Sequence, residues 1–502
     1  MPSPHARRTS CPVLDRRRAG ILLHPTSLPG PREGGELGRE ARRFVDFLVD
    51  VGASVWQMLP LGPPHEDLSP YAVQSAHAGN PRLIALDDLA AWGWVEHVPE
   101  GEAVDRGSCL GAAMQGFVEV AGEETRAEFQ RFVRENAAWL EDYILFQALR
   151  EAHGLAPWWE WPALLRDRES GALARAREQH AETLARHRFE QFVFHRQWRA
   201  LRSYANERGV LLFGDMPIFT AHDSADVWAA REYFRLDDEG RPVVVAGTPP
   251  DYFSATGQFW GNPLYDWARL RADDYRWWRE RVATQLQFFD LLRVDHFRGF
   301  EACWEIPAGA ESATEGRWVK APGEELFAVL QRELDPLPLV AEDLGYITEE
   351  VHALRVRFGL PGMRILQFAF DGGADNPYLP HNHVPDCVVY TGTHDNDTSL
   401  GWFQSLAPEA RKYVCAYLAV SGRDMPAAFV RTAFASVARL AVVPMQDVLG
   451  LGSEHRLNTP GVAGGNWSWR FSWDQMPAGT RDWLRRLLAL YGRTTPKNQC
   501  QR

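Results

Sequence analysis

Acidic residues follow four short apolar runs in this sequence. Asp215 ends one run, Asp295 a second and Glu342 a third, and Asp395 follows a fourth. Carboxylates that share one cavity repel each other, which raises the pKa of at least one of them. A carboxyl group that keeps its proton near neutral pH can act as a general acid. The pattern therefore predicts acid–base chemistry if the fold brings these ends together.

Each carboxylate also has a structural interpretation when it is taken alone. Asp295 has Arg293 and Arg298 as possible ion-pair partners, Glu342 can serve in a salt bridge, and the polar residues 395–397 suit a turn. A metal site is a further alternative, but no HxH or HExxH pattern occurs, and Arg293 would compete with a cation. Because acidic residues recur at the same end of separate runs, we favour the functional interpretation for the set and predict no metal.

The stretch 247–267 (GTPPDYFSATGQFWGNPLYDW) is rich in aromatic residues but has no helical or strand period. Loops usually expose polar side chains, so this density of rings requires a reason. Rings that bind the apolar faces of sugars, with Gln258 and Asn262 for hydroxyl contacts, would supply one. A buried loop packed against an inserted subdomain explains the pattern equally well.

Eight β-branched or apolar runs must position these residues, at Gly20–His24, Ser54–Leu59, Val210–Pro217, Leu291–Phe297, Leu339–Leu344, Met363–Phe370, Cys387–Thr391 and Leu440–Met445. Helical patterns lie between most of them, as at 348–359, where Val351, Leu354 and Phe358 share a face. Strands that alternate with helices indicate a parallel sheet, and eight of them predict a closed barrel. The predicted fold class is α/β, a (β/α)8 TIM barrel with large helical insertions.

Uneven spacing between the runs locates the insertions. We expect a disordered leader at residues 1–18, followed by a single catalytic barrel at 19–502 with inserted subdomains at about 85–207 and 219–288. Within the first, 123–207 has helical spacing. Residues 371–386 are rich in Gly, Pro and Asn, which predicts that one helix of the barrel is replaced by a loop.

Composition excludes several classes of protein. With 54 Lys and Arg against 66 Asp and Glu, the net charge of −12 disfavours nucleic acid and anionic membranes as partners. No apolar run reaches the length of about 20 residues that spans a bilayer. Six cysteines without a CxxC pair predict neither disulfides nor structural zinc, and we expect a cytoplasmic protein.

Long motifs then give the sequence a family resemblance, over about residues 19–488. They include GILLHPTSLPGP (20–31), GDMPIF (214–219), LLRVDHFRGFE (291–301), VAEDLG (340–345), YTGTHDNDT (390–398) and GNWSWR (465–470). The chain resembles the 4-α-glucanotransferases, or amylomaltases, of glycoside hydrolase family 77, within the α-amylase-like superfamily. The resemblance implies a retaining transfer of part of an α-1,4-glucan to the 4-hydroxyl of glucose or another glucan, with no cofactor.

The resemblance also implies a role for individual residues. Asp295 matches the nucleophile, Glu342 the acid/base, and Asp395 the carboxylate that holds the reacting glucose. Matching substrate contacts are Tyr71, Asp215, Tyr252, Phe253, Trp260, Arg293, His394 and Asn466. The expected partners are α-1,4-glucans and glucose. An α-1,4-glucan hydrolase, with water as acceptor, and a non-catalytic glucan-binding protein are the two alternatives.

Overall fold

A parallel sheet of eight strands forms the centre of the computed structural model, which describes residues 14–32, 34–99, 101, 104–250, 256–462 and 464–494. The strands are β1 (Arg18–Leu22), β2 (Val55–Gln57), β3 (Leu211–Met216), β6 (Leu291–Val294), β9 (Leu339–Ala341), β10 (Gly362–Ile365), β11 (Cys387–Tyr390) and β12 (Leu440–Pro444). Each overlaps one of the eight predicted runs. Their order in the sheet is β10-β11-β12-β1-β2-β3-β6-β9.

The two outer strands of this order, β9 and β10, meet and bring the sheet close to a full barrel. The Ala341 N–H donates to the Pro361 carbonyl at 2.8 Å, and the Met363 N–H donates to the Asp343 carboxylate at 2.7 Å. Gly362 is required at this seam, because a Cβ there would lie 2.3 Å from a carboxylate oxygen of Asp343. The predicted (β/α)8 barrel is confirmed.

Side chains from all eight strands fill the barrel interior. This buried cluster includes Leu22, Val55, Phe213, Leu291, Val340, Met363, Val388 and Leu440. The residues that alternate with them, such as Trp56, Leu212 and Val443, pack outward in the larger cluster that also holds the helices. Strands buried on both faces read as continuous apolar runs, which is why the sequence reveals them.

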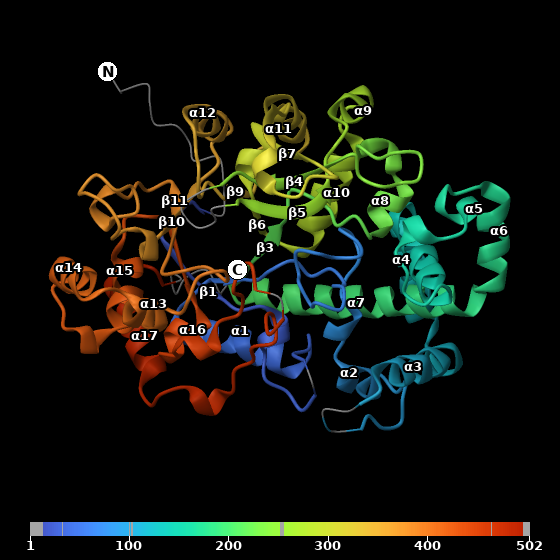
Figure 1. Ribbon diagram of the computed structural model, residues 1–502. Helices are drawn as coiled ribbons and strands as arrows, with labels where there is room; N and C mark the ends of the chain where they lie inside the picture. The colour runs from blue at the N-terminus through green and yellow to red at the C-terminus, as the bar shows by residue number, and fades with distance from the viewer. Residues whose placement is uncertain are drawn as a thin grey trace, which may run out of the picture.

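Helices cover the outside of the barrel (Figure 1). They include α1 (Arg39–Val51), α10 (Arg276–Phe288), α11 (Gly323–Glu333), α12 (Glu349–Arg357), α15 (Ala427–Ala435) and α17 (Thr480–Leu490). Between β10 and β11 the chain has only two short 3-10 turns, 366–368 and 380–382. The prediction that a loop replaces this helix is confirmed.

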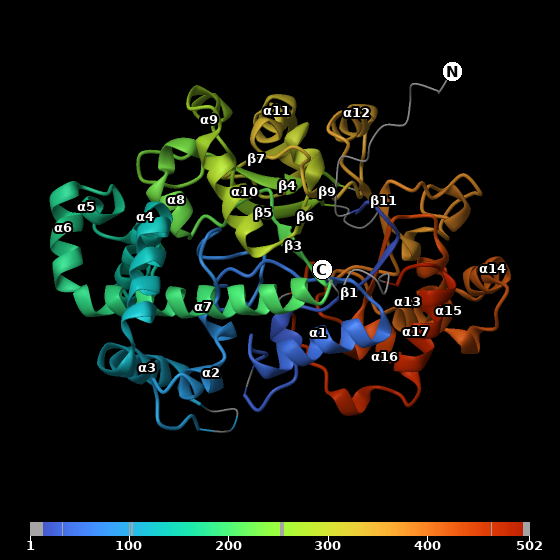
Figure 2. The ribbon, with the colours of Figure 1, turned by 180° about the vertical axis from the view of Figure 1, so that it is seen from behind.

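The chain between β2 and β3 forms a helical insertion on one side of the barrel. Its main members are α2 (Leu86–Ala91), α3 (Arg106–Val120), α4 (Glu123–Ala152), α6 (Ser170–Gln179) and α7 (Ala181–Glu207). Contacts between aromatic rings hold it together, as where Phe117, Phe129 and Phe192 meet with their centroids 5.2 to 5.9 Å apart. Seen from behind in Figure 2, α7 runs from α6 to the beginning of β3, so the insertion is anchored directly to the barrel.

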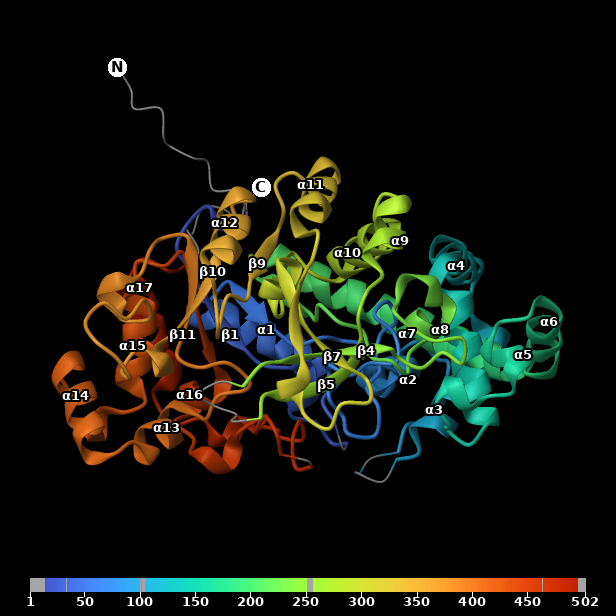
Figure 3. The same ribbon diagram turned by 45° about the horizontal axis from the view of Figure 1, so that its top comes forward.

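A second sheet lies over the barrel and corrects one prediction. Its strands β4 (Val244–Thr248), β5 (Gln258–Pro263), β7 (Ala302–Pro307) and β8 (Arg317–Lys320) pair antiparallel in the order β5-β4-β7-β8 (Figure 3). The interpretation of 247–267 as a loop is wrong for residues 247–248, which end β4, and for β5. The first residues of β5 are exposed and its last ones include Gly, Asn and Pro, so the strand has no hydrophobic alternation.

This small sheet also extends beyond the predicted insertion at 219–288, because β7 and β8 follow β6 in the sequence. At the other end of the chain, residues 14–18 of the predicted leader are structured. Leu14 is buried against the barrel interior, and Arg17 donates to the carbonyls of Phe434, Ser436 and Tyr491. The rest of the leader, residues 1–13, lies outside the described residues. Within the described part of the chain, no helix is long and apolar enough to cross a membrane.

Candidate active site

A cavity of about 1140 Å³ opens at the carboxyl ends of the barrel strands. Asp295 and Glu342 line it directly after β6 and β9, and Asp395 lines it from the loop after β11. The small sheet forms the opposite wall, with residues of β5 and β8 facing the cavity. The volume suits a ligand of several sugar rings. The fold therefore brings the predicted carboxylates to one place.

Arg293 lies between two of the carboxylates. Its Nη1 is 2.9 and 2.7 Å from the two carboxylate oxygens of Asp215 and 2.8 Å from Oδ1 of Asp295. The register of β3 and β6 places Asp215 beside Arg293, and Asp215 is only 1% exposed. Burial lowers the pKa of Arg293, but Asp215 and Asp295 outweigh burial and hold that pKa well above its usual value. Arg293 is therefore a fixed positive charge behind Asp295.

Glu342 is buried and held by two backbone donors. The N–H of His296 donates to its Oε2 at 2.8 Å, and the N–H of Leu344 donates to Oε1 at 2.9 Å. Burial, with the charge of Asp295 in addition, raises the pKa of Glu342 to about 8, although Arg293 and the two N–H groups oppose the shift. The predicted direction is right, but burial contributes more than the neighbouring carboxylates. At neutral pH Glu342 carries a proton.

The backbone at His296 makes this contact with Glu342 possible. His296 has φ 49° and ψ 48°, in the left-handed region that residues other than glycine seldom adopt. Side chains in such conformations cluster at functional sites, where the surrounding structure enforces them. His296 follows Asp295 directly and donates its N–H to Glu342 at 2.8 Å. One residue with a strained backbone therefore connects Asp295 and Glu342.

Asp395 is held by a histidine and an asparagine. His394 Nε2 lies 3.3 Å from its Oδ2, and the Asn458 amide donates to its Oδ1 at 2.6 Å. Burial raises the pKa of Asp395, but His394, Asn458 and Arg293 outweigh burial and hold the pKa well below its usual range. Asp395 therefore stays ionised under conditions in which Glu342 is protonated.

Tyr71 connects these groups into one wall. Its hydroxyl donates to Asp215 at 2.7 Å, and its ring stacks on His394 with centroids 5.0 Å apart. Trp467, with its backbone at φ 64°, lies 6.0 Å from both rings. One wall of the site is thus built from Tyr71, Asp215, Arg293, His394, Asp395 and Trp467.

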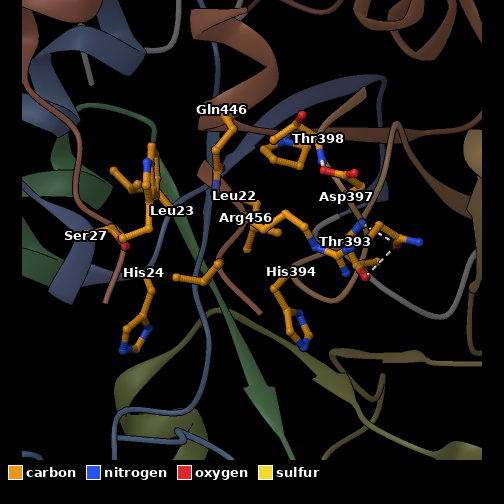
Figure 4. Close-up of a pocket in the computed structure, with 14 residues that line it drawn as sticks. Leu22, Leu23, His24, Ser27, Thr393, His394, Asp397, Thr398, Gln446 and Arg456 are labelled. Atoms are coloured by element: carbon orange, nitrogen blue, oxygen red, sulfur yellow. Dashed lines mark hydrogen bonds between the residues drawn. The ribbon is translucent and has the colours of Figure 1, made fainter. Parts of the chain in front are cut away.

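A small cavity behind His394 belongs to the same wall (Figure 4). It has a volume of about 20 Å³, far below that of a ligand pocket, and cannot hold a hexose. Figure 4 shows His24 and His394 on one side of it. Burial lowers the pKa of His24 to about 3, so His24 is neutral and adds no positive charge behind His394.

The aromatic residues of 247–267 do not all have the same environment: some line the cavity, as expected for sugar binding, and others are buried, as expected for a packed segment. Trp260 is 37% exposed, lines the cavity and meets His296 edge-on with centroids 4.7 Å apart. Tyr265, in contrast, is buried and donates its hydroxyl to the Ile218 carbonyl at 2.7 Å. One ring thus faces the site and the other packs in the core. Tyr252 and Phe253 lie outside the described residues.

Asn466 does not lie among the residues that line the cavity. Its carbonyl oxygen accepts from the Thr459 N–H at 3.0 Å and its amide donates to the Val462 carbonyl at 2.9 Å, so both ends brace its own loop. The asparagine that reaches the carboxylates is Asn458, which the sequence argument passed over although it lies in the RLNTPG motif. His296 and Trp467 were missed in the same way, although each adjoins a predicted site residue.

The described residues contain no group of three or more His, Cys, Asp or Glu side chains placed to hold a metal ion. The site carboxylates instead lie against Arg293 or His394, and Glu342 carries a proton. Two carboxyl groups with opposite protonation preference are the arrangement that glycosidic bond cleavage requires.

The family model and the relatives described below carry the same description. A family model described as 4-alpha-glucanotransferase matches residues 23–475. The 4-alpha-glucanotransferase of Thermus thermophilus is 54% identical over 473 residues, covering 90% of this chain and 94% of the relative. That of Synechocystis sp. is 47% identical over 506 residues, covering 96% and 99%.

Among solved structures, the amylomaltase of Streptococcus agalactiae, determined in complex with acarbose, matches with a TM-score of 0.92 and 36% identity. That match covers 96% of this chain and 100% of the other. The amylomaltase of Corynebacterium glutamicum has a TM-score of 0.74 at 18% identity, over 96% of this chain and 76% of that one, which supports the fold alone.

Proposed function

The chain belongs to the 4-alpha-glucanotransferase family, and from that premise we propose that Asp295, Glu342 and Asp395 carry out a retaining transfer on α-1,4-glucans. The observation that carries the proposal is the pair of unlike carboxyl groups. Glu342 has a pKa of about 8, while Asp295 is paired with Arg293 at 2.8 Å. One is a proton donor at neutral pH and the other a carboxylate nucleophile.

The first half of the reaction breaks the donor glucan. A carboxylate oxygen of Asp295 attacks the anomeric carbon as the bond from that carbon to the glycosidic oxygen breaks. Glu342 gives its proton to the departing oxygen, so the leaving glucan departs with a free 4-hydroxyl. The donor fragment remains as a β-linked ester on Asp295, and Glu342 becomes a carboxylate.

The second half reverses these roles. The carboxylate of Glu342 takes the proton from the 4-hydroxyl of the acceptor, whose oxygen attacks the anomeric carbon and breaks the ester. Asp295 returns to a carboxylate, Glu342 regains its proton, and the new linkage has the α configuration of the old one. This mechanism requires about 5 to 5.5 Å between the two carboxyl groups.

We call the wall built from Tyr71, Asp215, Arg293, His394, Asp395 and Trp467 the donor-side wall, and it supports the reacting glucose in both halves. Asp395, kept ionised by His394 and Asn458, accepts hydrogen bonds from sugar hydroxyls and stabilises the positive charge that develops on the ring. The ring of Tyr71 offers an apolar face beside them. Among the predicted substrate contacts, Asp215 acts through Arg293 and positions it.

The test is a product analysis on maltotriose alone, with oligosaccharides separated by length and reducing ends followed over time. Transfer predicts longer maltooligosaccharides and free glucose at a nearly constant number of reducing ends. A steady rise in reducing ends with only shorter products would identify a hydrolase instead. No change with maltotriose or with amylose would favour a glucan-binding protein.

Asp295→Asn is the matched control for that analysis. The variant keeps the size of the side chain but lacks the nucleophile, and we expect transfer to fall by at least about 10⁴-fold. Retention of glucan binding in this variant, measured by calorimetry, would show that the loss is chemical. Activity of this variant near that of the unchanged protein would contradict the assignment of Asp295.

A further inference from the structure

A second pair of aromatic side chains lines the cavity away from the catalytic carboxylates. Trp318 is a half-buried residue of β8, and Tyr346 lies in the loop after β9. The exposed fraction of Tyr346 is 69%, although Tyr346 lies only four residues after the buried Glu342. An exposed ring on the wall of a ligand cavity gains burial when an apolar surface covers it.

Arg298 fixes the position of both rings. Its guanidinium carbon lies 3.5 Å from the centroid of the Trp318 ring and 5.8 Å from that of Tyr346, and its Nη1 donates to the Tyr346 carbonyl at 2.8 Å. Arg298 is 5% exposed, and among the described residues it forms no ion pair with a carboxylate. The charge of Glu301 acts on this guanidinium without a direct ion pair, and the closest groups that stabilise it are the faces of the rings, a cation–π arrangement.

The attachment of these residues relates them to the reaction. Arg298 lies in the short 3-10 turn Phe297–Phe300, just after Asp295, and Tyr346 follows Glu342 on the same loop. Tyr346 and the arginine that contacts both rings are therefore carried by the two segments that hold the catalytic pair, whereas Trp318 is carried by β8. The donor-side wall, in contrast, comes from other segments except for Arg293, which lies on β6. The attachment of Tyr346 to the Glu342 loop, away from most of the donor-side wall, favours the acceptor side of the cavity for these rings.

The width of the small sheet indicates how far Trp318 lies from Trp260. Trp260 belongs to β5 and Trp318 to β8, which are the two edges of the four-stranded sheet. Neighbouring strands lie about 4.8 Å apart, so three spacings separate the edges by roughly 14 Å. Trp260 touches His296 beside the catalytic pair, whereas Trp318 lies at the far edge. The cavity therefore extends past the first ring for more than one sugar unit.

We propose that Trp318 and Tyr346, held by the positioning residue Arg298, form an outer acceptor platform that binds an α-1,4-linked glucosyl unit beyond the one that receives the donor. The platform stacks on the apolar face of a pyranose and favours maltooligosaccharide acceptors over glucose, which is too short to reach it. This inference rests on the proposed transferase function and adds its acceptor specificity.

The experiment varies the acceptor at a fixed amylose donor and measures kcat and KM for glucose, maltose and maltotriose as acceptors. In Trp318→Ala and Tyr346→Ala we expect the KM for maltotriose to rise about five- to tenfold, while kcat/KM for glucose stays within twofold. Tyr413→Ala is the matched control, because Tyr413 is an exposed tyrosine on α14 (Pro408–Leu418), away from the residues that line the cavity. This control should leave every acceptor unchanged.

Arg298 is tested by its effect on KM rather than on kcat. Arg298→Met keeps an apolar stem under Trp318 but removes the charge and the bond to the Tyr346 carbonyl, so we expect the KM for maltotriose to rise while kcat with glucose is retained. Tyr346→Ala keeps the proposal testable if the buried substitution does not fold. Equal loss for glucose and maltotriose, an effect on the donor only, or no effect in either ring variant would overturn the platform. Absence of transfer by the unchanged protein would instead overturn the proposed function.

Discussion

The donor-side wall and the small-sheet wall of the cavity are built in different ways. On the donor side, Asp215 and Arg293 are buried and the half-buried Tyr71 donates to Asp215, so a change in any one of them removes a contact of another. On the small-sheet side, Trp260 of β5 is exposed and Trp318 of β8 is half-buried, and both line the cavity. The difference teaches that the chemistry depends on coupled charges, whereas selection of the acceptor depends on rings that contribute separately.

The largest effect is expected from breaking the coupled side. Asp215→Asn removes the charge of a buried carboxylate and leaves Arg293 with Asp295 as its remaining close partner. Loss of one partner of a buried ion pair costs about 3 kcal/mol, and we expect kcat to fall by about 10²- to 10³-fold as well. Denaturant unfolding and initial rates of transfer measure the two effects.

Asp386→Asn is the control for that substitution. Asp386 pairs with Arg439 at 3.3 Å, but 65% of its side chain is exposed, so this pair contributes less than about 1 kcal/mol. If Asp215→Asn altered stability and rate as little as this surface variant, the donor-side wall would not act as a coupled unit.

The next effect is a pH dependence of the rate that arises from Glu342 and is independent of the aromatic residues of the small sheet. Glu342 must be protonated to act as the acid, and its pKa of about 8 is raised by burial, so the proton is present below that pH and is lost above it. We expect kcat/KM to fall tenfold per pH unit once the pH exceeds about 8. Trp318→Ala should show the same alkaline limb whatever its absolute rate. A limb near pH 5, or one displaced in the ring variant, would contradict this division.

The smallest effect is expected from one exposed ring. Trp260→Ala removes a side chain that donates to Gln258 at 3.0 Å and packs on His296, and we expect the acceptor KM to rise about fivefold. The melting temperature should move by only about 2 °C, because the ring is partly exposed already. Trp260→Phe should recover part of the affinity. A loss of stability as large as that in Asp215→Asn would show that the two walls are not built differently.

The barrel and its carboxylates were predictable because both leave a local signal. Parallel strands buried on two faces form continuous apolar runs, and the residue that follows each run lies at the carboxyl end of a strand. Asp295 and Glu342 were found in this way before any geometry was known. The sequence did not decide which arginine pairs with Asp295, because both Arg293 and Arg298 were available. In the structure Asp295 pairs with Arg293, and Arg298 lies against the aromatic ring of Trp318.

The small sheet was not predictable by the same means. Its β5 strand is half exposed and carries Gly261 and Asn262, so no period of two appears in the sequence. The outer platform combines Trp318 and Tyr346, which are far apart in the chain and gathered by the fold around Arg298. Asn458 and Asn466 lie in equally distinctive motifs, and only the path of the loop decides which one reaches Asp395.

The contact between β9 and β10 that closes the barrel lies next to Glu342 in the chain. Asp343, which receives the Met363 N–H across that seam and pairs with Arg355 at 3.2 Å, is the neighbour of Glu342 in the chain. A thermal fluctuation that separates β9 from β10 therefore also displaces the proton donor. Local opening needs less energy than unfolding of the whole domain. On heating, the protein is expected to stop working while most of its structure is still intact, with the failure beginning at this one dipeptide.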